Sequence, residues 1–326
     1  SVRLPSDDGE FSVTSHLGEQ LPSIHAKNGW LEFTVNDSPK YLSFRGKNEK
    51  LASAPEALLV KVAVVPCLGD ELVVKVENLS GKAMKAKIVL DHADGLAVVE
   101  NAKEITIPAD EAVSDAVFRL RESPQGAYEL GAKMEVNGVV VSEISPRRFS
   151  APDAAVLQGA RAVGEGDPKI GGTFTLSQAD APEKFPGGSA AVMKLDYDFQ
   201  PGWKYVPVYP GAPGKKLEGR PGAEHGRALF GMWIHGDSSH LTPRLRVSDA
   251  GGRTWQPSAP DIKWKGWKYV EMKLDEGTAN WGGADDKQKR GPKFPLTWDS
   301  PFLFDNTKRL AAKGTIYFTM PVMILE

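Results

Sequence analysis

The sequence predicts an all-β protein in which two β-sandwiches follow one another. Short runs of alternating apolar and polar residues recur along the whole chain, and Gly, Pro, Asn or Asp bounds most of them. Helical periodicity is nearly absent, and only RLAAKG (309–314) suggests a helical turn. The 33 Gly and 24 Pro are scattered singly, which is typical of many turns between strands.

Composition and charge exclude several functional classes. The chain has 326 residues, of which 41% are hydrophobic, enough for two or three packed domains. A formal net charge of -2 supplies no basic field for nucleic acid. No apolar run reaches the roughly 18 residues of a membrane span. The chain opens on SVRLPSDDGE, without Met or a signal peptide, so we expect a mature or excised fragment.

The first 56 residues contain strand-like runs at 10–17, 30–36 and 40–46. Asn36–Pro39 predicts a hairpin turn between the second and third runs. This segment is too small for a domain of its own. We expect it to be the tail of a neighbouring module or a set of extra strands on the next one.

Residues 57–151 predict an immunoglobulin-like sandwich. Seven or eight strand runs follow at the 8–12-residue spacing of such folds, among them LLVKVAVV and ELVVKVEN. Polar residues and two prolines in SPRRFSAPDA (145–154) predict an interdomain connection.

Residues 152–326 predict a β-jelly roll, because eight strand runs follow one another here. Seven of the eight tryptophans lie in this part: Trp203, Trp233, Trp255, Trp264, Trp267, Trp281 and Trp298. Such an enrichment in one domain directs the search for a binding surface to this half of the chain.

Two motifs in this half carry a family resemblance: D-x-x-G-x-x-W at Asp249–Trp255 and W-x-G-W-x-Y-V at Trp264–Val270. With the closing strand GTIYFTMPVMIL (314–325), they resemble the jelly-roll sugar-binding modules of the galactose-binding-domain-like class. Residues 57–151, with VENLSGK and EITIPADEAVSDAVFRL, resemble the immunoglobulin-like spacers of carbohydrate-active proteins. The resemblance implies a non-catalytic, carbohydrate-binding region of a secreted or cell-surface protein, linked to or associated with a catalytic domain.

The resemblance also implies a structural calcium, but the chain departs from the pattern. The closing strand of the class usually carries an acidic residue after its aromatic residue, whereas Thr319, Met320 and Pro321 follow Phe318 here. Calcium needs six to eight oxygen ligands. The carboxylates that remain as candidates are Asp153, Glu165, Asp167 and Asp180. The alternative is that these are solvated turn residues.

Aromatic residues in polar surroundings are the candidate sugar platforms, because an indole offers a large rigid face to the C–H face of a pyranose. Trp281 lies in the polar, Gly-rich segment 277–294 and is the strongest candidate. Trp264, Trp203 and Tyr205 also lie in loop-like surroundings. By contrast, Trp233 and Trp267 are expected in the core, which is the usual place for aromatic residues at strand spacing.

The two-residue period of a strand indicates which polar side chains could contact a ligand beside these aromatic residues. In TPRLRVSD, Arg244 and Arg246 are expected on one face, and Leu245 and Val247 on the other. His235 is a further candidate ligand residue. Arginine suits bidentate contact with a carboxylate or sulfate, so an acidic or sulfated polysaccharide is one hypothesis. The alternative is a solvated outer face of an antiparallel sheet.

No motif for a nucleophile elbow, a phosphate loop, a dinucleotide fold or a zinc protease is present. We therefore expect no catalysis, no cofactor besides the calcium, and a polysaccharide or oligosaccharide as the partner. One alternative is a purely structural region that braces a glycoside hydrolase or surface protein and binds no ligand. A hydrolase or lyase would require titratable groups that converge in one cleft.

Overall fold

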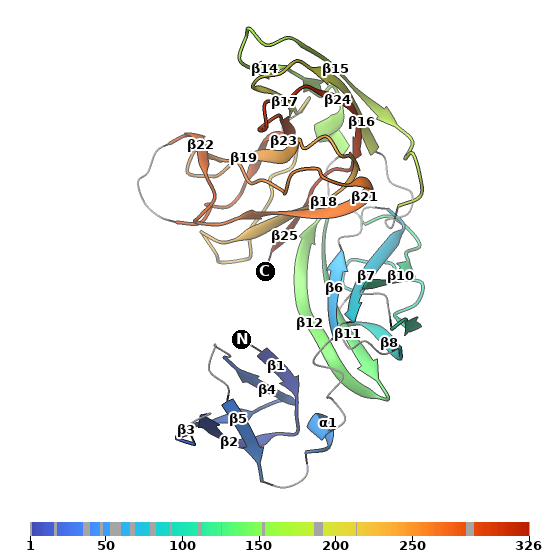
Figure 1. The fold of residues 1–326 in the computed structure, drawn as a ribbon, viewed down its shortest axis with the longest axis vertical. Helices are drawn as coiled ribbons and strands as arrows, with labels where there is room; N and C mark the ends of the chain where they lie inside the picture. The colour runs from blue at the N-terminus through green and yellow to red at the C-terminus, as the bar shows by residue number, and fades with distance from the viewer. Residues whose placement is uncertain are drawn as a thin grey trace.

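The computed structural model is an all-β protein, as the sequence predicts (Figure 1). It describes residues 2–15, 18–34, 40–45, 48–52, 60–65, 69–78, 83–91, 93–109, 113–124, 126–151, 154–185, 192–212, 214–284 and 290–325. Every strand pair in these ranges is antiparallel. None of the helices in them is long and apolar enough to cross a membrane.

The N-terminal segment forms two small sheets. Its elements are β1 (Val2–Pro5), β2 (Gly9–Ser15), β3 (Gln20–Ala26), β4 (Trp30–Phe33), β5 (Lys40–Phe44) and the short helix α1 (Glu49–Ala52). Strand β4 pairs with β1, whereas β5 pairs with β2. The hairpin predicted between these two runs is therefore wrong, and its turn residues 36–39 lie outside the described ranges. A small core around Phe11 and Leu31 holds the sheets together.

The first large sandwich is built from seven described strands: β6 (Val60–Val65), β7 (Glu71–Asn78), β8 (Met84–Asp91), β9 (Ala102–Ile107), β10 (Val113–Arg119), β11 (Ala127–Val136) and β12 (Val139–Ser150). Strands β10-β7-β6 form one sheet, and β12-β11-β8-β9 belong to another. Alternation places Leu72, Val74 and Val76 of β7 in the core between them. The immunoglobulin-like topology stays a prediction.

The C-terminal sandwich contains thirteen strands in the described residues. They are β13 (Arg161–Ala162), β14 (Glu165–Gly166), β15 (Gly172–Ala179), β16 (Val192–Phe199), β17 (Lys204–Tyr209), β18 (Ala228–Asp237), β19 (Thr242–Ser248), β20 (Arg253–Trp255), β21 (Lys265–Leu274), β22 (Asn280–Gly283), β23 (Thr297–Asp305), β24 (Ala312–Phe318) and β25 (Val322–Leu325). A 3₁₀ helix (Ala154–Leu157) precedes them. The predicted helical turn at 309–314 is wrong, because β24 begins at Ala312.

Two sheets face each other in this sandwich. A seven-stranded sheet has the order β13-β17-β23-β19-β20-β22, with β14 paired to β17. A ten-stranded sheet has the order β15-β16-β24-β18-β25-β12-β11-β8-β9, with β21 paired to β18. Buried side chains from both sheets, among them Phe230, Trp255, Phe302 and Phe318, form one core. The jelly-roll order of the connections stays a prediction.

The ten-stranded sheet runs through both sandwiches, because strand β25 lies between β18 and β12. Arg148 to Ser150 of β12 pair with Met323 to Leu325 of β25. Figure 1 shows the long strand β12 running from the first sandwich to the second. Residues 145–150, predicted as a connection, are therefore part of a strand. The domain limits at 56 and 151 stay predictions.

Candidate functional site

The outer face of the seven-stranded sheet carries most of the predicted ligand residues. In β19, Leu245 and Val247 are fully buried in the core, and Arg244 and Arg246 lie on the opposite face. This confirms the predicted parity, which follows from the two-residue period of a strand. Arg246 is only 3% exposed, so other side chains cover it on this outer face.

Strand β17 contributes aromatic rings to the same face. Val206 and Val208 point into the core, and this parity leaves Tyr205 and Tyr209 on the outer side. Trp203 comes just before the strand and is 39% exposed. Its ring centroid lies 5.4 Å from that of Tyr205, within the range of favourable aromatic pairs.

Trp281 lies next to these rings. The Gly-rich segment around it forms the edge strand β22, which pairs with β20. Its side chain is 46% exposed, and its ring lies 6.4 Å from Tyr205 in a T-shaped arrangement. The guanidinium of Arg246 lies 4.1 Å from the centre of the Trp281 ring. We call Trp203, Tyr205 and Trp281 the aromatic platform.

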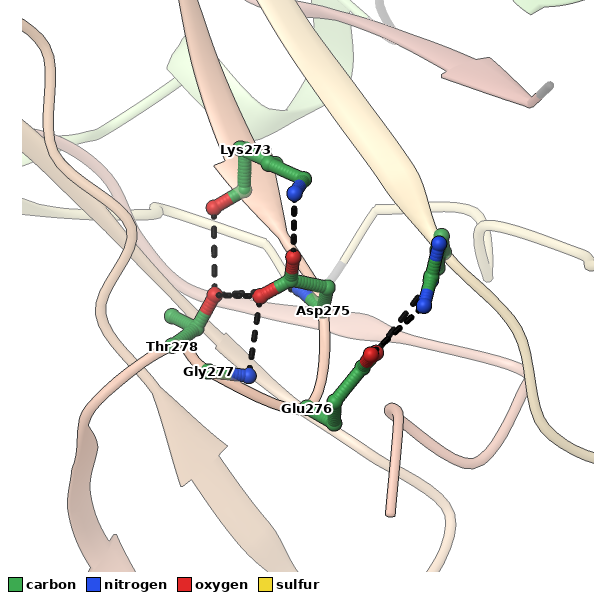
Figure 2. Close-up of polar contacts among 6 residues, drawn as sticks. Lys273, Asp275, Glu276, Gly277 and Thr278 are labelled. Atoms are coloured by element: carbon green, nitrogen blue, oxygen red, sulfur yellow. Dashed lines mark hydrogen bonds and ion pairs between the residues drawn. The ribbon is translucent and has the colours of Figure 1, made fainter. Parts of the chain in front are cut away.

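A tight turn leads from β21 into β22. The carboxylate of Asp275 accepts a hydrogen bond from the backbone N–H of Gly277 (2.9 Å), and the hydroxyl of Thr278 accepts one from the N–H of Asp275 (3.0 Å). Figure 2 shows this turn, with Glu276 pointing away from it. The guanidinium of Arg227 binds Glu276 through two nitrogens. These contacts fix the point where the chain enters β22.

Asp249 organises the turn between β19 and β20, and its side chain is completely buried. Its carboxylate accepts hydrogen bonds from the backbone N–H groups of Gly251 (2.8 Å), Arg253 (3.0 Å) and Lys293 (3.1 Å), the indole of Trp255 (3.1 Å) and the guanidinium of Arg290 (3.0 Å). The D-x-x-G-x-x-W motif thus has a physical cause. The carboxylate of Asp249, its first residue, accepts a hydrogen bond from the indole of Trp255, its last residue. Burial alone would raise the pKa of Asp249, but these hydrogen bonds outweigh it and lower the pKa.

Three carboxylates lie near the arginines or the tyrosines of this face. Asp305 Oδ2 lies 3.4 Å from Nε of Arg244, and Glu165 accepts a hydrogen bond from the hydroxyl of Tyr209 at 2.6 Å. Burial raises the pKa of Asp305, while Arg244 lowers it. Burial also raises the pKa of Asp299, while Arg246 lowers it. The platform therefore has hydrogen-bond acceptors beside it as well as donors.

The same carboxylates affect the tyrosines. Burial, together with the hydrogen bond to Glu165, raises the pKa of Tyr209 to about 12. Burial and Glu165 likewise raise the pKa of Tyr205, while Arg246 lowers it. Both phenols are thus neutral hydrogen-bonding groups at physiological pH.

Two predicted ligand residues lie apart from the platform. His235 is on β18 of the ten-stranded sheet, with Nε2 3.3 Å from Glu183 and its ring against Trp267 and Tyr317. Trp264 is half-buried against the core, and its indole donates to the carbonyl of Ile234 at 3.3 Å. The structure thus separates His235 and Trp264 from Trp203, Tyr205, Trp281, Arg244 and Arg246.

The described residues show no converging calcium ligands. Asp167 caps a turn by accepting the N–H of Lys169 (2.9 Å), and Asp180 is exposed after β15. Asp153 lies outside the described ranges. Within those ranges no three His, Cys, Asp or Glu side chains gather around one point. Between β24 and β25, Thr319 Oγ1 accepts a hydrogen bond from the backbone N–H of Trp233 (3.0 Å).

The carboxylates Asp299 and Asp305 do not form the pair that a glycosidase needs. They stand six residues apart on β23, which corresponds to roughly 20 Å along a strand. The two carboxyl groups of a glycosidase are only about 5–10 Å apart. Sequence reasoning missed these two residues because Pro301 lies between them and obscures the alternation of β23.

Comparisons with known proteins give distant similarities. No family model and no curated protein matches the sequence. The family 11 carbohydrate-binding module of the cellulosomal cellulase Lic26A-Cel5E of Clostridium thermocellum is structurally similar, with 9% identity over 52% of this chain and 88% of that chain, at a TM-score of 0.31. A carbohydrate-binding module of the β-sandwich superfamily with promiscuous specificity has 13% identity over 83% of this chain and 100% of its own, at 0.29.

A two-domain protein of unknown function from Bacteroides fragilis NCTC 9343 covers 79% of this chain and 90% of its own, with 9% identity and a TM-score of 0.18. Because all these TM-scores are low, function is inferred below from the side chains of the aromatic platform.

Proposed function

We propose that the aromatic platform binds a carbohydrate, and that the chain is the non-catalytic binding region of a larger secreted or cell-surface protein. The exposed indoles of Trp203 and Trp281, which flank Tyr205, are the observation that carries the proposal. Large aromatic rings with accessible faces are suited to the apolar face of a pyranose. Isolated apolar residues on a surface need no function, but these rings adjoin each other and polar groups.

The rigidity of the platform supports this proposal. Arg246 donates a hydrogen bond from its Nε to Gln256 (2.7 Å), and its guanidinium lies against the Trp281 ring. A ring that is already ordered loses little conformational entropy when a ligand stacks on it. Polar groups around the rings can then fix the ligand hydroxyls, as in most small-molecule sites.

The proposal is tested by affinity gel electrophoresis against a panel of soluble glycans. Trp281→Ala should weaken binding about 30-fold or more, the effect of losing an aromatic residue that contributes about 2 kcal/mol. Trp30→Ala is the matched control, because this indole also lies under an arginine (Arg3, 4.2 Å) but on the N-terminal sheets. Retardation that Trp281→Ala leaves unchanged would refute the site.

A structural, ligand-free role is the second candidate. The sheet that continues from one sandwich to the other through β25 favours this role, because two sandwiches joined by one sheet would hold the domains attached to them at a fixed distance. Absence of retardation by every glycan in the panel would leave this role as the better account.

A further inference from the structure

Strand β15 (Gly172–Ala179) is an open edge of the ten-stranded sheet. It pairs with β16 along its whole length and without a register shift. Within the described ranges no other strand pairs with its free side. Phe174 and Leu176 point from β15 into the core of the C-terminal sandwich, but they are only partly buried. A further strand at this edge would bond to the backbone of β15 and cover these two side chains.

The register shows which backbone groups of β15 are free. Gly171 accepts a hydrogen bond from the N–H of Gln200, and these two residues continue the register of β15 and β16. Hydrogen-bonded pairs alternate along an antiparallel ladder, so every second residue from Thr173 bonds to β16. The N–H and C=O groups that point away from β16 belong to the residues between them: Gly172, Phe174, Leu176 and Gln178.

Strand β15 lacks the features that protect the edge of a sheet. Its sequence GTFTLSQA contains no charged residue and no Pro, and its pairing contains no bulge. By contrast, the edge strands β9, β10 and β21 carry charged side chains of both signs, and β3 contains Pro22 and a register shift. Charges, prolines and bulges keep an exposed edge from pairing with another chain. A long, regular edge without them is suited to such pairing.

The strand is complementary to itself. Antiparallel pairing of β15 with a second copy, about a two-fold axis at Thr175, matches free backbone groups with free backbone groups. This register places opposite each other Gly172 and Gln178, Thr173 and Ser177, Phe174 and Leu176, and Thr175 of the two copies. Pairs of Thr with Thr or Ser stabilise a sheet, whereas like charges directly opposite each other destabilise it. An uncharged strand therefore pairs with itself without repulsion.

The charged residues of the neighbouring strand β16 do not oppose this pairing. Lys194 Nζ lies 2.8 Å from Asp196, and Asp198 lies 2.7 Å from Nζ of Lys313. These charges are thus compensated within each copy.

We propose that the protein forms a two-fold symmetric dimer in which the β15 strands of two copies pair and join their ten-stranded sheets. The inference goes beyond the proposed carbohydrate binding and is independent of it, because the aromatic platform lies on the seven-stranded sheet.

Sedimentation velocity over a dilution series measures the dissociation constant of the dimer. Thr175→Lys should raise this constant about tenfold or more, because it replaces a Thr–Thr pair by two like charges directly opposite each other. Thr173→Lys is the matched control on the same face of the same strand. It faces Ser177 of the second copy, and the two new charges lie roughly 13 Å apart, so salt screens them and we expect a change of less than about threefold.

Disulfide cross-linking tests the register directly. The Cα atoms of residue 175 in the two copies should lie about 4.5 Å apart, within the range of a disulfide. Those of residue 173 should lie roughly 13 Å apart, beyond the limit of about 7 Å. Under mild oxidation Thr175→Cys should give a disulfide-linked dimer, and Thr173→Cys should give no more of it than wild type, which contains Cys67.

A wild type that stays monomeric up to about 1 mM would overturn the proposal. A dimer that Thr175→Lys leaves unchanged would also overturn it, as would equal cross-linking of the two cysteine variants. Circular dichroism checks that each variant is folded, and if Thr175→Lys is not, the cysteine variants decide. None of these measurements involves a glycan, so their failure leaves the proposed function untouched.

Discussion

Replacing Asp249 by Asn should destabilise the C-terminal sandwich more than any other isosteric change near the platform. The amide keeps one acceptor oxygen but presents an NH₂ group either to the indole of Trp255, Arg290 and the N–H of Lys293, or to the N–H groups of the turn itself. Buried N–H groups that now donate to the carboxylate would then face the NH₂ group of the amide, which is itself a donor. The change also leaves the guanidinium of Arg290, 15% exposed, without its anionic partner Asp249.

The expected loss follows from these contacts. Hydrogen bonds to a charged group contribute about 1.5–3 kcal/mol each, and part of this is offset because a neutral amide is easier to bury than a carboxylate. Removal of one partner of a buried ion pair typically costs about 3–5 kcal/mol, and we expect this for Asp249→Asn. For a domain of about 150–250 residues this lowers Tm by roughly 6–20 °C.

Urea denaturation, followed by tryptophan fluorescence, measures the change in the free energy of unfolding. Asp275→Asn is the control, because Asp275 also caps a turn but its side chain is 14% exposed, whereas that of Asp249 is fully buried, so we expect a loss of only about 1 kcal/mol. A free energy of unfolding for Asp249→Asn within 1 kcal/mol of wild type would show that the buried carboxylate is not what holds this turn.

The pH dependence of stability has a definite sign. The pKa of Asp249 is lower in the folded protein than the value of about 3.9 in an unfolded chain. Its contribution is therefore complete above that unfolded value and is lost as the pH falls through the folded pKa. Below about pH 4 the difference in stability between wild type and Asp249→Asn should shrink, and a difference that stays constant to pH 2 would contradict this assignment.

Two further predictions concern the ten-stranded sheet. A Cβ on Gly231 would lie 1.9 Å from the hydroxyl of Tyr269, so Gly231→Ala should cost about 1–3 kcal/mol by urea denaturation, whereas Gly282→Ala, with no atom within 4 Å, should cost little. Ile324 is buried in the first core and Leu325 in the second, so each change to Ala should cost about 2–5 kcal/mol and should destabilise both sandwiches together. Separate unfolding transitions in either variant would contradict the coupling through β25.

Local alternation was sufficient to predict much of the fold and part of the site. The parity of β19 places Arg244 and Arg246 opposite Leu245 and Val247, as expected from a two-residue period. The exposure of Trp281 was also predicted, because its neighbours are Gly and polar residues. Its position in an edge strand was not, since Asn280–Gly283 has no strand signal and pairs with β20 with a register shift.

Long-range pairing could not be predicted from the sequence. GTIYFTMPVMIL looks like one closing strand, but it is divided into β24 and β25 near Pro321, which has no backbone N–H to donate. Its second half pairs with β12, a strand from the other sandwich. Residues 145–150 looked like a linker, but Arg147 to Ser150 pair with β11 on one side, and Arg148 to Ser150 pair on the other side with β25, about 175 residues further along the chain.

Strand β25 also bears on whether carbohydrate binding and a structural spacer role exclude each other. Val322 and Ile324 lie in the first core, and Met323 and Leu325 lie in the second. Since successive side chains of a strand point to opposite faces, one short strand closes both cores at once. A rotation of one sandwich against the other would break β-ladder hydrogen bonds and expose apolar side chains. The aromatic platform is therefore held at a fixed orientation to the first sandwich, so a rigid spacer and a sugar-binding surface are compatible roles of the same unit.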